Sequence, residues 1–447
     1  MLAFVAPTRP KQPLAMPHTD VLILGAGLAG ISAALYARSP YRLIEKSDRV
    51  GGLCKTDVRE GFHFDATGHW LHLRDPEIQR LAEEALPGGW VTVERKAGIW
   101  SHHRFTRYPY QVNTQGLPPE VIAENVLGFI EAHYGESGRA LREREPRNFA
   151  EFILRHLGPG FAKNFMFPYN AKLWTVHPRE MSTAWMGRFV PRPTVEQVVR
   201  GALGLEGDRA GYNATFLYPK QGGIEGFVRA LAERLPRPAE CAVHPVAIDP
   251  SIRTARLSTG EEVSWKRIVA TIALPDLVRL CAGAPAVVLE AAAQLRATTV
   301  TYVNVAARDA GGPPFHWVYL PEDRYSAYRV GSASAAVPSL APPGCRSFYV
   351  EFSAGAPLPA ATVEREALEI LLDLGFLRAR EDVLFTEAHA IPNAYVIYDE
   401  RYGPAQSEIV AWLEARDILV AGRYGRWEYS SMEDALLTGR ECARKAG

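Results

Sequence analysis

Val21-Leu-Ile-Leu-Gly25-Ala-Gly27-Leu-Ala-Gly30 is the stretch that decides the fold, because four apolar residues run into a turn with three spaced glycines. The apolar run predicts a buried strand, and the residues after the turn predict a helix. Gly25 permits a tight turn, Gly27 lets the backbone approach a pyrophosphate at the helix N-terminus, and Gly30 lets the helix pack closely on the strand. The stretch therefore predicts a strand–turn–helix unit that binds a dinucleotide.

Two later elements narrow the dinucleotide to FAD. Glu45 ends a short strand expected over 41–44, where its carboxylate can accept a hydrogen bond from a ribose hydroxyl. Gly51 and Gly52 supply further backbone N–H groups beside the same pyrophosphate, and this pairing of motifs resembles the two-dinucleotide-binding FAD proteins. In this part of the chain we expect cofactor contacts from Gly25, Gly27, Leu28, Ala29, Gly30, Glu45, Lys46, Gly51, Gly52 and Leu53.

The composition excludes several classes of function. The 447 residues, 47% of them hydrophobic, are enough for two or three domains with a large core. Lys plus Arg equals Asp plus Glu, at 50 each, so no overall field favours nucleic acid or an anionic membrane. No run reaches the roughly 18 apolar residues of a membrane span. Five scattered cysteines suggest neither a disulfide framework nor a zinc site, so we expect a cytoplasmic protein without an integral membrane segment.

The pattern along the chain predicts a cofactor domain that is interrupted by other domains. Residues 1–17 are punctuated by proline and are expected to form a disordered leader. Apolar residues recur at helical spacing in 120–130 and 149–157, whereas β-rich runs at 299–305 and 347–352 indicate an antiparallel sheet. We predict an α/β fold with a Rossmann-like FAD domain at 18–75, 211–290 and 400–447, a mainly helical domain at 76–210 and an antiparallel sheet substrate domain at 291–399.

Seven blocks spread over most of the chain carry a family pattern. They are Phe64-Asp65 with Gly68-His69, Tyr108-Pro-Tyr-Gln111-Val-Asn113, Pro168-Tyr-Asn170-Ala-Lys-Leu-Trp174, Met181 to Gly187, Asn213-Ala-Thr-Phe with Gly222-Gly223, Trp317-Val-Tyr319 with Tyr328-Arg329, and Gly422-Arg-Tyr-Gly-Arg-Trp-Glu-Tyr429. In this order they resemble the UDP-galactopyranose mutases, nearer the eukaryotic type and its bacterial relatives than the short bacterial type. That family lies within the wider amine oxidase and protoporphyrinogen oxidase superfamily.

The resemblance implies a flavin-dependent isomerase that interconverts the pyranose and furanose forms of a nucleotide-diphosphate sugar of the UDP-galactopyranose type. The implied reaction is redox-neutral: N5 of reduced FAD attacks the anomeric carbon, the nucleoside diphosphate leaves, and the flavin N5–sugar adduct opens and recloses in the other ring size. The source of the reductant stays open between NAD(P)H bound in the substrate pocket and a partner protein.

Two alternatives stay open beside the mutase. Tyr218-Pro-Lys-Gln-Gly-Gly223 also resembles FAD-dependent oxidoreductases of the amine oxidase or protoporphyrinogen oxidase type. A flavin-binding scaffold without catalytic activity is the other hypothesis. The oligomeric state cannot be read from the sequence.

The resemblance also assigns roles to individual positions. His69 would lie in a mobile loop over the flavin, and Asn213 would lie near the sugar and flavin N5. Arg329 would bind the departing pyrophosphate, since its planar fork can bind two phosphate oxygens. Tyr319 and Tyr429 would offer hydroxyls to the pyrophosphate. The uridine end would be lined by Tyr108, Gln111, Asn170 and Trp174, and further cofactor contacts are implied at Gly68, Gly422, Arg423, Tyr429, Ser430 and Met432.

Three positions depart from the family pattern. A second phosphate-binding arginine is expected on Phe189, whereas this chain has Arg188 one position earlier and Arg192 three positions later. If the segment is helical, a shift of one residue turns a side chain by about 100°, so Arg188 is a substrate-binding candidate but not an automatic substitute. Two expected tyrosines fall near Ala336 and Ile391, with Tyr395 and Tyr398 close behind the latter. Losing charge-assisted contacts worth roughly 1.5–3 kcal/mol each predicts weaker nucleotide binding.

Overall fold

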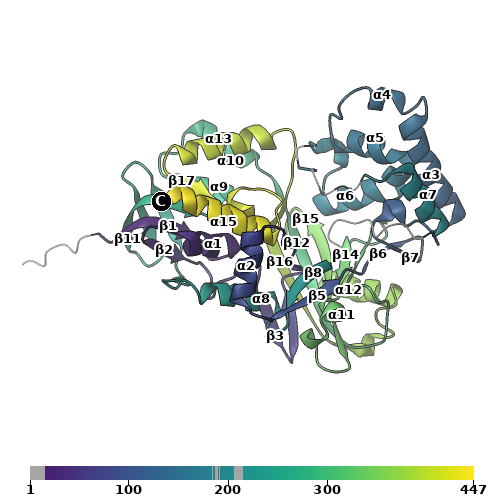
Figure 1. The fold of residues 1–447 in the computed structure, drawn as a ribbon, viewed down its shortest axis with the longest axis horizontal. Coiled ribbons are helices and arrows are strands. Elements are labelled where there is room, and N and C mark those ends of the chain that lie inside the picture. Colours follow the sequence, from purple (N-terminus) through teal and green to yellow (C-terminus); the bar gives the residue numbers. More distant parts are fainter. Residues whose placement is uncertain (1–15, 184, 187–189, 191, 206–214) are drawn as a thin grey trace, which may run out of the picture.

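The computed structural model describes residues 16–183, 185–186, 190, 192–205 and 215–447. All but the last two residues of the predicted leader 1–17 therefore lie outside the described part of the chain. Figure 1 shows three parts: an α/β part that contains both ends of the described chain, a helical part, and a part centred on a sheet with long strands. None of the helices that the described residues form is long and apolar enough to cross a membrane.

The first sheet is assembled from three separate stretches of the chain. Its apolar parallel strands are covered on both faces, since Leu22 and Leu24 pack in one hydrophobic cluster and Val21 and Ile23 in another. The strands, in order, are β2 (Tyr41–Ile44), β1 (His18–Leu24), β11 (Glu262–Ala270), β10 (Thr254–Leu257) and β9 (Pro245–Asp249), with β17 (Ile418–Val420) paired to the end of β11. Parallel pairing joins β2 to β1, β1 to β11 and β11 to β17. β10 runs antiparallel to both of its neighbours, β11 and β9.

Helices cover both faces of this sheet (Figure 1). On the face of Val21 and Ile23 lie α1 (Leu28–Tyr36) and α15 (Met432–Ala446), whose residues share that cluster. The opposite cluster is completed by α9 (Leu274–Leu280), α10 (Ala286–Gln294) and α13 (Tyr402–Glu414). The remaining elements of this part are β3 (Thr56–Arg59), β4 (Phe62–Asp65), α2 (Pro76–Ala85), β5 (Trp90–Glu94), β8 (Thr215–Pro219), α8 (Gly223–Ala232) and α14 (Gly422–Gly425).

The second sheet has seven strands and is antiparallel except where β13 runs parallel to β6. Its order is β16 (Val383–Val396), β12 (Ala297–Arg308), β15 (Cys345–Ala354), β14 (Arg329–Gly331), β13 (Trp317–Tyr319), β6 (Ala97–Ser101) and β7 (Arg104–Arg107). The helix α12 (Ala360–Asp373) packs on it, and α11 (Ala333–Ala336) and the turns Pro338–Leu340 and Arg380–Asp382 lie in its connections.

The sheet thus takes two strands from the stretch 76–210, which the sequence predicts to be mainly helical. All five residues of β6 are buried, so the strand shows no alternation of polar and apolar residues that would reveal it.

The helical part is held together by one core that includes Phe129, Phe149 and Phe161. The Asn148 side chain caps α5, and Thr194 forms a capping box with Gln197 at the start of α7. The elements are Tyr110–Val112 (3-10), α3 (Pro119–Tyr134), α4 (Arg139–Arg142), α5 (Phe149–Phe161), Ala162–Met166 (π), α6 (Phe167–Trp174), Pro178–Glu180 (3-10) and α7 (Val195–Leu203).

The predicted fold class is confirmed. A Rossmann-like sheet is built from non-contiguous segments and is accompanied by a helical part and a largely antiparallel sheet. The residue boundaries of the three domains stay a prediction.

Candidate active site

A cavity of about 470 Å³ lies where the first sheet meets the second. Its lining comes from the turn between β1 and α1, the residues after β2, the loop after β4, strands β14 to β16, and the chain from Gly422 to Ala435. This position, beyond the carboxyl ends of parallel strands, is where open α/β sheets bind ligands. The volume is in the range of a cofactor or small-molecule site.

Glycine residues shape one side of the cavity. Gly25 has a φ of +98°, and an added Cβ would lie 2.5 Å from the Thr271 hydroxyl oxygen. A Cβ on Gly30 would lie 1.8 Å from the Gly25 carbonyl oxygen. Gly27 begins α1 without a side-chain cap, so the N–H groups of the first helical turn stay available to a ligand. Side chains at Gly25 and Gly30 would destroy this geometry.

Glu45 lines the cavity next to the glycine turn. Its side chain is 8% exposed and lines the cavity directly after β2. The N–H of Ala26 donates to Oε2 at 2.7 Å, and the N–H of Ser47 donates to Oε1 at 2.9 Å. A carboxylate held this way retains lone pairs for a ribose hydroxyl. The cavity, the helix N-terminus and Glu45 together fit the pyrophosphate and ribose of FAD.

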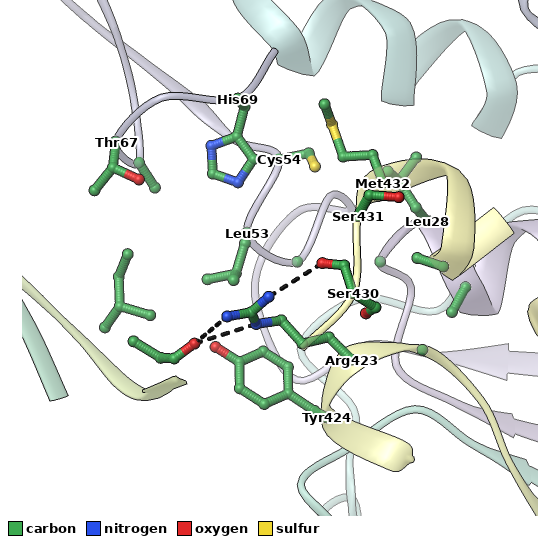
Figure 2. A pocket seen from close by; sticks show the side chains of 18 of the residues that line it. Leu28, Leu53, Cys54, Thr67, His69, Arg423, Tyr424, Ser430, Ser431 and Met432 are labelled. Carbon is green, nitrogen blue, oxygen red and sulfur yellow. Dashed lines mark hydrogen bonds between the residues drawn. The ribbon is translucent and has the colours of Figure 1, made fainter. Parts of the chain in front are cut away.

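Arg423 comes from the C-terminal part of the chain and reaches into the cavity beside Tyr424 and Ser430, as Figure 2 shows. Its Nη1 donates to the Ser430 carbonyl at 3.1 Å, and Nε donates to the Ala394 carbonyl at 3.2 Å. The guanidinium carbon is 5.3 Å from the ring centre of Tyr395 and 4.9 Å from that of Tyr429. The preceding Gly422 has a φ of +73°, so Arg423 is placed by a backbone turn that favours glycine.

His69 points into the cavity, near Leu53 and Cys54 (Figure 2). Its Nδ1 is buried and has no hydrogen-bond partner among the described residues. Burial lowers the pKa of His69 to about 4, and the positive charges of Arg423 and Arg329 act in the same direction. The imidazole is therefore neutral at physiological pH, with one ring nitrogen able to donate and the other able to accept.

Arg329 and Glu351 form an ion pair on neighbouring strands, in which Glu351 is buried and the Arg329 side chain is 20% exposed. They face each other in the register of β14 and β15, and both line the cavity. Arg329 Nη2 donates to Glu351 Oε1 at 2.8 Å, and Nε donates to the other carboxylate oxygen. Burial opposes the charge of Arg329, but Glu351 holds the pKa above its ordinary value. Nη1 has no hydrogen-bond partner among the described residues, so one edge of the fork stays available for a ligand.

Tyrosine side chains surround this ion pair. Tyr319 faces Arg329 in the register of β13 and β14, and its ring centre lies 5.3 Å from those of Tyr108 and Tyr169. Tyr395 lines the cavity and stacks on Tyr429 with ring centres 5.9 Å apart. Tyr319 and Tyr108 are not among the residues that line the cavity.

Three residues predicted to contact uridine are packed inside the helical part. Gln111, Asn170 and Trp174 are 4%, 6% and 2% exposed and do not line the cavity. Asn170 Nδ2 donates to the Met166 carbonyl at 2.7 Å, and Trp174 Nε1 donates to Asn170 Oδ1 at 3.3 Å. Gln111 Oε1 is buried without a partner in the described part of the chain. Their contact with a nucleotide stays a prediction.

The structure brings most of the predicted residues to one cavity. Two predicted residues, Arg188 and Asn213, lie outside the described part of the chain. Two others, Gly30 and Lys46, do not line the cavity. Gly30 instead packs against the Gly25 carbonyl. The predicted residues that do line the cavity are Gly25, Gly27, Leu28, Ala29, Glu45, Gly51, Gly52, Leu53, Gly68, His69, Arg329, Gly422, Arg423, Tyr429, Ser430 and Met432.

The departures from the family pattern have distinct locations. Arg192 lies over the ring of Phe152, at 5.0 Å, beside a second cavity, so it does not contribute to the cofactor cavity. Ile391 lines the cofactor cavity, as does Tyr395 four residues later. Ala336 ends α11 and packs against the neighbouring hydrophobic clusters.

Several lining residues were not predicted from the sequence, among them Thr67, Thr271 and Tyr424, and Glu351 is the charged one. It is 1% exposed and stands between the buried apolar residues Val350 and Phe352 of strand β15. An acidic residue at such a position requires a charged partner, because an unpaired buried carboxylate is costly. That signal could have identified Glu351, although not its pairing with Arg329.

Comparisons with known proteins agree with this geometry. The family model described as flavin containing amine oxidoreductase matches residues 28–446. A crystal structure of reduced UDP-galactopyranose mutase is similar with a TM-score of 0.88 and 26% identity, over 95% of this chain and 93% of that chain. A putative protoporphyrinogen oxidase from Exiguobacterium sp. 255-15 shares the fold, with a TM-score of 0.74 and 18% identity over 96% of this chain and 99% of that chain.

A curated relative matches only in part. The inactive all-trans-retinol 13,14-reductase of Danio rerio is 31% identical over 78 residues, which are 17% of this chain and 13% of that protein. The family model, in contrast, spans nearly the whole chain, so the assignment does not depend on this short match. The chain belongs to the family of flavin-containing amine oxidoreductases.

Proposed function

We propose that this flavoprotein is a redox-neutral pyranose–furanose mutase that acts on a nucleotide-diphosphate sugar of the UDP-galactopyranose type. The observation that carries the proposal is Arg329, which lines the cofactor cavity with one edge of its guanidinium fork available for a ligand. The similarity to reduced UDP-galactopyranose mutase over 95% of the chain supports it.

The charges around the cavity favour an anionic substrate. Arg329 and Arg423 both line it, and the guanidinium of Arg423 already lies over the rings of Tyr395 and Tyr429. Aromatic rings without such a cation would suit an ammonium group, but here a second cation would be repelled. A diphosphate is attracted by the same arrangement.

Glu351 gives Arg329 a defined orientation. Because Nε and Nη2 are bound by the carboxylate, the remaining Nη1 edge is held by two hydrogen bonds before substrate arrives. A preorganised donor stabilises the negative charge that develops on a departing diphosphate without a reorganisation cost. In the proposal, the hydroxyls of Tyr319 and Tyr429 also donate hydrogen bonds to the diphosphate. The unpartnered Gln111 Oε1 accepts a hydrogen bond from the base.

Reduced FAD, when bound, supplies the nucleophile for the anomeric carbon. The protein holds the cofactor through the glycine turn, the N-terminus of α1 and Glu45. His69 faces the cavity as a neutral imidazole, so in the proposal it donates or accepts a hydrogen bond at the cofactor without adding a charge. Asn213 keeps its proposed place near the sugar, and NAD(P)H stays one proposed source of reductant.

Ligand binding tests the proposal against its alternative. The oxidised holoprotein is titrated with UDP, with uridine and with an aliphatic amine, while flavin absorbance is followed. We expect UDP to bind at least about tenfold more tightly than uridine, because one charge-assisted contact contributes roughly 1.5–3 kcal/mol. Equal affinity for UDP and uridine would contradict the role of Arg329.

Amine oxidation is the second candidate function, because the family model describes an amine oxidoreductase. It predicts that the holoprotein consumes oxygen when an amine is added. Such turnover in air, without conversion of a nucleotide sugar, would replace the mutase proposal.

A further inference from the structure

Lys172 on α6 places its ammonium group in a cage of backbone carbonyl groups. Nζ donates to the carbonyls of Leu320 at 2.8 Å, Glu322 at 2.7 Å and Ala327 at 3.3 Å. All three belong to the turn that connects β13 with β14. The three N–H groups of the ammonium are therefore matched to three acceptors on a single turn.

The turn held by Lys172 connects two residues of the proposed substrate site. Tyr319 ends β13 and Arg329 begins β14, where they face each other in register. Within the turn, the N–H of Leu320 donates to the Tyr328 carbonyl at 2.9 Å. A displacement of the turn would therefore also displace Tyr319 and Arg329.

A second contact fixes α6 at the same place. The hydroxyl of Ser353 on β15 donates to the carbonyl of Leu173, next to Lys172, at 2.8 Å. α6 is thus attached to β15 as well as to the turn. The helical part is connected by adjacent residues to the three strands that carry Tyr319, Arg329 and Glu351.

We propose that Lys172 is a positioning residue that holds the 320–328 turn, and through it Tyr319 and Arg329, in the geometry that binds the diphosphate of the substrate. The identity of that substrate rests on the proposed function, whereas the hold on the turn does not.

The protonation state of Lys172 makes the proposal measurable. Burial lowers the pKa of Lys172 to about 8, while Asp323 and Glu322 act in the opposite direction. Glu322 in turn pairs with Arg324 at 2.9 Å and accepts from the N–H of His102. A neutral amine has only two N–H groups for three carbonyls, so the turn loses a donor above about pH 8.

The pH dependence of the free energy of unfolding distinguishes a local loosening of the 320–328 turn from global unfolding. The folded-state pKa lies below the ordinary value of 10.5, so the unfolded chain binds the proton more strongly. The contribution of Lys172 to stability therefore rises as the pH increases from about 8 toward 10.5. Weaker nucleotide binding in this range would not arise from unfolding caused by Lys172.

The test compares holoproteins carrying Lys172→Met and Lys172→Arg with wild type. Lys163→Met is the matched control, because Lys163 is 70% exposed and pairs with Glu124 on the surface of the helical part. Hydrogen exchange of the peptide covering 320–328 and the dissociation constant for UDP are measured below and above about pH 8. Flavin content and the exchange of β1 report on global folding.

For Lys172→Met we expect faster exchange in 320–328 and about tenfold weaker UDP binding, with unchanged flavin content. Wild-type affinity should fall above about pH 8, and Lys172→Arg, which does not titrate, should remove that fall. If Lys172→Met fails to fold, the comparison of wild type with Lys172→Arg carries the test. Unchanged exchange in 320–328, or the same alkaline fall in Lys172→Arg, would overturn the proposal. Faster exchange in a protein whose wild type does not bind UDP would support the positioning role and overturn the proposed function.

Discussion

The cofactor cradle and the substrate wall line the same cavity but are built differently. The cradle comprises Gly25, Gly27, Glu45, Gly51, Gly52 and Gly422, which line the cavity, with Gly30 packed behind them. In the proposal it binds the cofactor mainly through backbone N–H groups, which added side chains would block. The wall that we propose for the substrate comprises Arg329, Glu351, Tyr395 and Tyr429, and in the proposal it acts through side-chain atoms. The cradle should therefore be sensitive to added atoms, and the wall to lost or displaced functional groups.

The largest effect is expected from Gly30→Val in the cradle. The new Cβ would meet the Gly25 carbonyl at 1.8 Å, and backbone at this turn cannot move without separating α1 from β1. We expect complete loss of bound flavin, measured as flavin absorbance per protein, together with reduced folding. The control is Gly403→Ala, since nothing lies within 4 Å of a Cβ at that position. A yellow, folded Gly30→Val protein would contradict the cradle described above.

Arg329→Lys removes the fork from the wall while keeping its charge. The lysine cannot bind Glu351 and a diphosphate in the same planar geometry. We expect turnover of the nucleotide sugar to fall by about 100-fold, with flavin content unchanged. Arg329→Ala is less informative, because it leaves a buried carboxylate unpaired at a cost of about 3–5 kcal/mol. Arg308→Lys, at the exposed end of β12, serves as the control; equal activity of the two lysine variants would exclude the fork as the diphosphate ligand.

Glu351→Gln tests whether the wall depends on orientation as well as on charge. The amide can still accept from Arg329 at one atom but no longer binds both guanidinium nitrogens as a carboxylate does. We expect about a tenfold loss in turnover, smaller than that of Arg329→Lys, and retention of FAD. Steady-state kinetics and flavin content measure both effects. A loss of flavin without a change in the kinetics of the remaining holoprotein would assign Glu351 to the cradle instead.

The smallest effect concerns the pH dependence contributed by His69. Its folded-state pKa is lowered to about 4 from an ordinary value of 6.5, so the unfolded chain takes up the proton first. The stability that His69 contributes is present above about pH 6.5 and is lost as the pH falls toward 4. Thermal unfolding of wild type should show this acid slope, and His69→Gln should reduce it. An unchanged slope would indicate that His69 is not buried as a neutral group.

The sequence predicts the cradle more completely than the wall, for a physical reason. The requirements of a pyrophosphate are met by local backbone geometry, so Gly25, Gly27 and Glu45 identify the cradle within one short segment. The wall depends on residues that only β-sheet pairing brings together. Arg329 could be proposed from a resemblance, but its partner Glu351 follows from the register of β14 with β15.

The same reasoning explains why two strands from the stretch predicted to be mainly helical belong to the second sheet. β6 and β7 join the second sheet because β6 pairs with β13, which lies more than two hundred residues later in the chain. No local pattern in a fully buried five-residue strand reveals such a partner. The fold class was predictable from the periodicity of the longer elements, whereas the extent of the second sheet depended on long-range pairing.

The most direct test of the central claim counts product molecules per flavin under anaerobic conditions. The holoprotein is reduced with dithionite, freed of excess reductant and mixed with a large excess of UDP-galactofuranose, while the flavin spectrum is recorded and products are separated by chromatography. The account predicts many molecules of the pyranose per flavin, a flavin that is still reduced at the end, and no conversion by the oxidised protein. Flavin that becomes oxidised in proportion to product, or activity only in the oxidised protein with an amine, would contradict it.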